Sequence, residues 1–127
     1  MISNILEARG PTVRVVILRT DGTVDERLVD MSPSARPMES VLGGPITFNG
    51  QYIDEMVIIV RRQRHGIINT HILPPPFHND TIRGDICLVR MDETATPQDY
   101  TREEYNRLRN EHFITRNTVY RHRSKSI

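Results

Sequence analysis

The chain has 127 residues, of which 37% are hydrophobic and 26% charged, and its formal net charge is +1. This length fits one domain with a core of its own, and no apolar stretch approaches the roughly 20 residues that a membrane-spanning helix needs. The single cysteine, Cys87, excludes a disulfide framework and a cysteine-based zinc site. We therefore expect a soluble protein of the cytoplasm or another reducing intracellular compartment, without membrane association.

The first expected elements form a hairpin. The segment TVRVVILR at Thr12–Arg19 has apolar side chains on both faces, which is typical of a central strand. Asp21-Gly22 is a turn signal. The segment Thr23–Asp30 has few apolar positions and is expected to be the exposed partner strand.

A short helix and a short strand follow. The helix is predicted over Pro37–Leu42 and should end at Gly43-Gly44-Pro45, because glycine accepts the left-handed end of a helix and proline cannot continue it. The strand is predicted over Ile46–Phe48. Asn49-Gly50 is typical of a hairpin turn and should end this strand.

The strongest strand pattern is MVIIVRR within Glu55–Arg62. We expect a turn at Gln63–Gly66 and a returning strand over Ile67–Leu73. Pro74–Pro76 should end that strand, because proline donates no hydrogen bond to a ladder. A further strand is expected at Asp85–Met91.

An acidic loop is expected over Asp92–Tyr100, followed by a helix over Arg102–Phe113. Thr101 and Glu104 match the capping-box pattern at its start. This element order predicts one α+β domain over residues 1–113, with a mixed, mostly antiparallel sheet of about five or six strands and two short helices. Residues 114–127 are expected to form a basic C-terminal tail without acidic residues.

Several of these features occur in the same order in a known family: a helix ending in Gly-Gly (Glu39–Gly44), a hairpin around Met56–Ile68, Leu73-Pro74, Gly84-Asp85 within Ile82–Met91, and Tyr-Thr-X-Glu-Glu at Tyr100–Glu104. Over about Val13–Phe113 the chain resembles a small domain of unknown function, common in phage genomes and found also in algae and their viruses. The triple proline and the basic tail depart from its pattern. The resemblance implies an accessory or structural role, in the host cell or virion for a viral member. It supplies no activity and no site residue.

Four candidate binding residues surround the turn after the strongest strand: Arg61, Arg62, Arg64 and His65. They either form a tip that binds phosphate or carboxylate groups, or keep the hairpin soluble and its edge unpaired. Arg61 and Arg62 should point to opposite faces of the strand, so only part of the cluster can form one surface.

Two further binding candidates are the proline loop and the tail. Pro75 and Phe77 either present an apolar ridge to a partner or belong to a rigid crossover between sheet elements. Arg121, Arg123 and Lys125 of the tail either bind nucleic acid or an acidic partner, or belong to a solvated terminus.

His71, His78 and Asp80 are weak candidates for a metal site, which requires three converging ligands. The alternative is that they are ordinary loop and hairpin residues, so no metal or cofactor is expected. No serine, cysteine or histidine lies in a nucleophile motif, and no glycine-rich loop opens a helix. We therefore predict no catalytic residue and favour a protein that is not an enzyme.

These observations favour a small non-enzymatic module that binds another macromolecule, with a protein as the expected partner, as an accessory part of a larger assembly. The alternative is a nucleic-acid-associated protein that uses the basic tail and the arginine-rich turn, with binding that falls steeply with salt. A homo-oligomer formed through an exposed sheet edge stays open.

Overall fold

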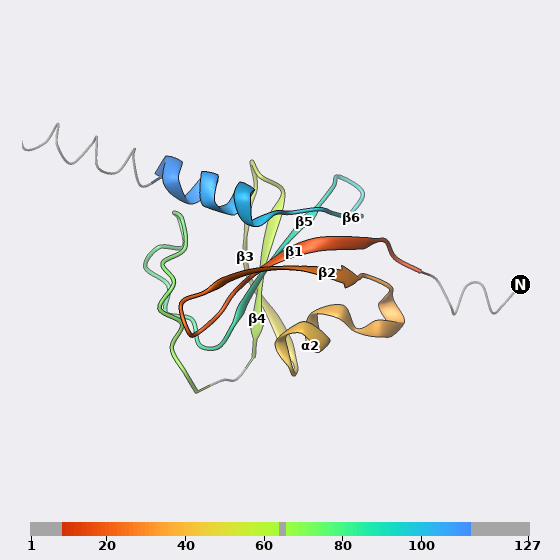
Figure 1. The fold of residues 1–127 in the computed structure, drawn as a ribbon, viewed down its shortest axis with the longest axis horizontal. Coiled ribbons are helices and arrows are strands. Elements are labelled where there is room, and N and C mark those ends of the chain that lie inside the picture. The colour runs from red at the N-terminus through yellow and green to blue at the C-terminus, as the bar shows by residue number, and fades with distance from the viewer. Residues whose placement is uncertain (1–8, 64–65, 113–127) are drawn as a thin grey trace, which may run out of the picture.

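The computed structural model describes residues 9–63 and 66–112 (Figure 1). Six strands form one sheet in the order β2-β1-β5-β4-β3, with β6 beside β5, and every neighbouring pair is antiparallel. The strands are β1 Thr12–Leu18, β2 Val24–Asp30, β3 Ile46–Tyr52, β4 Val57–Arg62, β5 Ile86–Met91 and β6 Pro97–Gln98. The chain also forms a 3₁₀ turn at Pro33–Ala35, helix α2 at Pro37–Leu42 and a helix over residues 102–112. One sheet with these helices confirms the predicted α+β class.

β1 is a central strand, as the apolar side chains on both of its faces predict. It lies between β2 and β5. Val13, Val15 and Ile17 pack in a cluster with α2, whereas Val16 and Leu18 pack in the cluster on the opposite face. A strand buried on both faces carries no polar face, which explains the continuous apolar run.

The sheet is covered by a helix on each face (Figure 1). Met38 and Leu42 of α2 pack on one face. The helix over 102–112 packs Tyr105 and Leu108 on the other. Neither helix, nor any other in the part of the chain that the structure describes, is long and apolar enough to cross a membrane.

Both helices have the predicted end signals. α2 ends at Gly43, which has φ 83° and donates its N–H to the Glu39 carbonyl at 2.7 Å. Thr101 and Glu104 form the predicted capping box, with the Glu104 N–H donating to Thr101 Oγ1 at 3.1 Å. Residue 113, the predicted last residue of this helix, lies outside the described residues.

The prediction that Asn49-Gly50 forms a turn is wrong. β3 continues through both residues to Tyr52, and the pairing with β4 shifts between Phe48 and Gly50 in a β-bulge. The chain reverses over residues 53–56 instead, where the Met56 N–H donates to the Ile53 carbonyl at 3.1 Å. Gly50 is needed for a close approach of the Phe77 ring, not for a turn.

The predicted strand Ile67–Leu73 is also absent. β4 pairs with β3 on one side and β5 on the other, so no open edge remains for a returning strand. The chain over residues 67–82 crosses the sheet as an irregular segment, with one isolated bridge between Ile68 and Arg83. The predicted acidic loop contains the short strand β6, which pairs with the end of β5.

Candidate functional site

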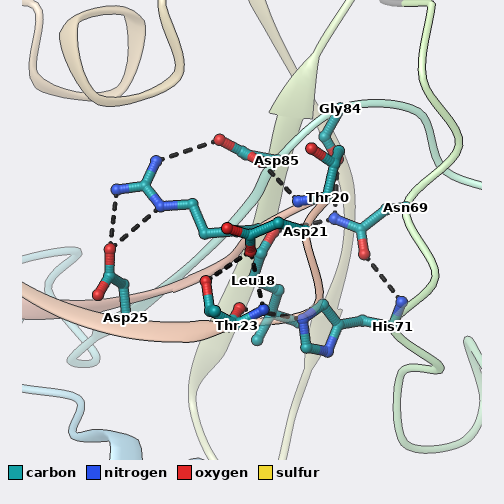
Figure 2. Close-up of polar contacts among 10 residues, drawn as sticks. Leu18, Thr20, Asp21, Thr23, Asp25, Asn69, His71, Gly84 and Asp85 are labelled. Carbon is teal, nitrogen blue, oxygen red and sulfur yellow. Dashed lines mark hydrogen bonds and ion pairs between the residues drawn. The ribbon is translucent and has the colours of Figure 1, made fainter.

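A network of polar side chains lies where β1 ends and β5 begins (Figure 2). The Arg19 guanidinium donates to Asp25 at 3.1 and 3.0 Å and to Asp85 at 3.1 Å. The Thr20 N–H donates to the other oxygen of Asp85 at 2.9 Å. Burial alone would lower the pKa of Arg19, but the two carboxylates raise it, so the guanidinium stays charged. This network holds the first hairpin against the start of β5.

The buried amide of Asn69 extends the network to the irregular segment (Figure 2). Its Nδ2 donates to the carbonyls of Leu18 and Gly84, each at 2.9 Å, and its Oδ1 accepts the His71 N–H at 2.9 Å. All these groups are satisfied within the protein, so the geometry indicates a structural connection. Neither Asn69 nor Arg19 stands out in the sequence, because no local motif marks either residue.

The three residues considered for a metal site have other surroundings. His71 Nε2 lies 3.1 Å from the Thr23 carbonyl, and Asp80 accepts a hydrogen bond from Asn49 at 3.0 Å. His78 Nδ1 is buried and has no partner among the described residues. Within residues 9–63 and 66–112, no group of three or more His, Cys, Asp or Glu residues could hold a metal ion. The fold therefore does not assemble these three as a ligand set.

A chain of hydrogen bonds joins the end of β4 to the proline loop. Arg61 Nε donates to Asn49 Oδ1 at 3.0 Å, and Asn49 Nδ2 donates to Asp80 Oδ2 at 3.0 Å. Arg61 also donates to the Arg62 carbonyl at 3.2 Å. Two candidates from separate parts of the sequence, Arg61 and Asp80, are thus linked through Asn49.

The proline loop packs on the sheet. The rings of Phe77 and Tyr52 meet edge to face with centroids 5.3 Å apart, and the Tyr52 hydroxyl donates to the Pro74 carbonyl at 2.7 Å. Phe77 also lies directly over Gly50, and Pro75 is half-buried. This packing supports the crossover interpretation of the loop, because the Phe77 ring faces the sheet and is not presented as a ridge.

The remaining cationic candidates do not form one described surface. Arg62 lies against Gly44 at the end of α2, whereas Arg61 lies on the other face with Asn49. The Arg62 Nε is buried without a partner among the described residues. The other candidates lie outside the described residues: Arg64, His65, Arg121, Arg123 and Lys125.

Cys87 is a buried residue of β5. Burial raises the pKa of its thiol to about 12. A thiol becomes a nucleophile only as the thiolate. Its position therefore suits core packing and not covalent catalysis.

An apolar surface remains open beyond α2, on the side of β3. Phe48 is 68% exposed, and its cross-strand partner Val60 places it on the α2 face of the sheet. Half-buried Ile46, Ile58 and Met91 lie on the same face. We call Ile46, Phe48, Ile58 and Met91 the Phe48 patch. It exists because a helix of six residues cannot cover a face of five paired strands.

A groove of about 200 Å³ lies on the side of β2. Its walls include Arg27, Val29 and Asp30 of β2 and Pro37 and Val41 of α2. We call this the α2 groove. The Phe48 patch and the α2 groove therefore flank the same helix, one near each edge strand of the sheet.

Comparisons with known proteins place this fold in a family. The comparisons with curated proteins and with solved structures give no significant match. A family of unknown function, DUF5880, matches residues 16–108, which is most of the described chain. The match also covers most of Val13–Phe113, over which the order of elements resembles a known family. The chain belongs to the DUF5880 family of unknown function.

Proposed function

We propose that this protein is a small non-enzymatic module that binds another protein as an accessory or structural part of a larger assembly. The observation that supports the proposal most directly is the Phe48 patch. Phe48 is an aromatic side chain exposed on an edge strand that carries no charged residue. Single exposed apolar residues are common on monomers, but adjoining ones on one face are what a partner can bury.

The surroundings of Phe48 suit an anchor residue. Ile46 lies two residues away on the same face of β3, and Ile58 lies two residues from Val60, the partner of Phe48. Ile58 in turn pairs with Val89 of β5, beside Met91. Aromatic anchors surrounded by apolar contacts carry much of the energy of protein interfaces.

The proposed setting follows from two separate arguments. The family resemblance favours a viral or algal system. The buried free thiol of Cys87 suits a reducing intracellular compartment, where cysteines stay unpaired.

Affinity capture from the native cell, with nuclease present, tests the proposal. The wild type and an Ile53→Asp control should capture the same protein, whereas Phe48→Asp should lose it by about tenfold or more, as removal of an anchor does. Ile53 is a matched control because it is 78% exposed but lies in the turn after β3. Circular dichroism should show that both variants fold.

Two results would contradict the proposal. One is equal capture by Phe48→Asp and the wild type. The other is recovery of nucleic acid only, with loss of all capture after nuclease treatment. That second result, with a steep salt dependence, would support the nucleic-acid alternative.

A further inference from the structure

β2 is the regular edge of the sheet. All seven of its residues pair with β1 without a register shift, whereas the opposite edge strand, β3, is broken by its bulge. The other side of β2 has no strand beside it among the described residues. An uninterrupted edge is a template on which an extended chain can add a further strand.

The hydrogen bonds that flank β2 show which of its backbone groups face outward. The Arg19 N–H donates to the Thr23 carbonyl, and the Met31 N–H donates to the Pro11 carbonyl. Because facing residues alternate in an antiparallel ladder, the N–H and C=O groups of Glu26, Leu28 and Asp30 point away from β1. In the described residues, no hydrogen bond is made to these outward groups.

The two faces beside this edge differ. On the α2 face, the α2 groove lies next to Arg27 and Val29, so alternate side chains of an added strand would enter it. By their alternation with Arg27 and Val29, the side chains of Glu26, Leu28 and Asp30 point to the other face, although Leu28 and Asp30 also border the groove. Leu28 is 58% exposed. The Glu26 carboxylate already accepts the Arg102 N–H at 2.9 Å and lies 3.7 Å from the Arg14 guanidinium. The Asp30 carboxylate accepts from Ser32 and is exposed. An occupant should therefore be apolar toward the groove and basic toward Asp30.

The charges of β2 disfavour pairing with a second copy of this chain along the middle of the strand. β2 carries three carboxylates and one arginine. Symmetric antiparallel pairing centred on Glu26 or on Arg27 would place each of them opposite its own copy. Pairing centred on Leu28 would place Glu26 opposite Asp30. Like charges directly opposite each other destabilise strand pairing.

We propose that the edge of β2 docks an extended basic segment of a partner protein, which adds to the sheet as a further strand beside α2. The backbone groups of Glu26, Leu28 and Asp30 hydrogen-bond to this segment. Its apolar side chains enter the α2 groove, and a basic side chain lies opposite Asp30. The site is separate from the Phe48 patch and does not depend on it.

The test uses the purified full chain and a capped seven-residue peptide of alternating valine and lysine. Binding should slow amide hydrogen exchange at Glu26, Leu28 and Asp30. A valine–glutamate peptide should bind about tenfold more weakly, which corresponds to about 1.4 kcal/mol. A valine–lysine peptide that is N-methylated at its lysines should not bind. The lysines lie opposite Glu26, Leu28 and Asp30, so their N–H groups are the donors of the ladder.

Leu28→Pro supplies a protein variant with a matched control. Proline is tolerated where the N–H faces away from the sheet, so this variant should fold but lose the peptide, whereas Leu28→Ala should keep it. Equal binding of the methylated peptide, or exchange protection away from β2, would overturn the proposal. Concentration-dependent protection of these amides without any peptide would also overturn it, because a second copy would then fill the edge.

Discussion

The side-chain amide of Asn69 connects three stretches of the chain that are distant in sequence. It bonds to the end of β1 through Leu18, to the start of β5 through Gly84, and to its own segment through His71. A segment without regular structure must satisfy its backbone groups one by one. Within this segment, the Asn69 N–H donates to the Ile82 carbonyl at 2.8 Å. The side-chain amide also satisfies two buried carbonyls outside the segment, those of Leu18 and Gly84.

Replacing this amide should destabilise the protein. Asn69→Ala leaves two buried carbonyls without their donor, so we expect the free energy of unfolding to fall by about 2–3 kcal/mol. Urea denaturation followed by circular dichroism measures this loss. Asn49→Ala is the control, because its bonds to Arg61 and Asp80 lie nearer the surface and should contribute only about 0.5–1 kcal/mol. Equal losses would contradict the special role of the buried amide.

At this scale the sequence is a poor guide. Asn69 lies within Ile67–Leu73, where the sequence predicts a returning strand, and its partners Leu18 and Gly84 lie 51 and 15 residues away. The local pattern cannot carry information about such contacts. Cys87 is the opposite case, because its position inside an apolar strand pattern predicts burial and the structure confirms it.

At the scale of elements, the proline loop and β3 depend on each other. A Cβ at Gly50 would lie 2.4 Å from the Phe77 ring. A Cβ at Gly44 would lie 2.8 Å from the Arg62 guanidinium, which is the end of a flexible side chain. The same substitution should therefore have different costs at the two positions.

We expect Gly50→Ala to lower the free energy of unfolding by about 1–3 kcal/mol, as overpacking does in a well-packed contact. Gly44→Ala should cost less, because Arg62 can move into solvent. Thermal unfolding of both variants provides the comparison. A double variant, Gly50→Ala with Phe77→Ala, should lose less stability than the sum of its single variants. Strictly additive losses would show that the ring does not limit Gly50.

The elements that the sequence predicts well are those with local signals. β1 and β5 follow from runs with apolar residues on both strand faces, and α2 follows from its glycine stop. The strand predicted over Ile67–Leu73 is absent, because these residues belong to an irregular segment in which Leu73 is buried while Ile72 is exposed. The same limit applies to the binding surfaces. Phe48 is exposed to a partner because β3 is an edge strand, and no local sequence pattern predicts the order of the strands.

At the scale of the whole molecule, the strand order separates the two proposed binding surfaces. β2 and β3 lie at opposite ends of the main order, with β1, β5 and β4 between them. The Phe48 patch belongs to one end and the α2 groove to the other. Two partners, or two parts of one partner, can therefore bind without competing for the same residues.

This separation predicts that each surface can be disabled alone. Phe48→Asp should leave the affinity for the valine–lysine peptide within about twofold, because no shared contact couples the two positions. Leu28→Pro should likewise leave capture of the cellular partner unchanged if that partner binds through the Phe48 patch only. Isothermal titration of the peptide and affinity capture with each variant provide the four measurements. A cellular partner lost in both variants would show that one protein spans α2 and uses both edges, because multivalent contacts fail together when either part is removed.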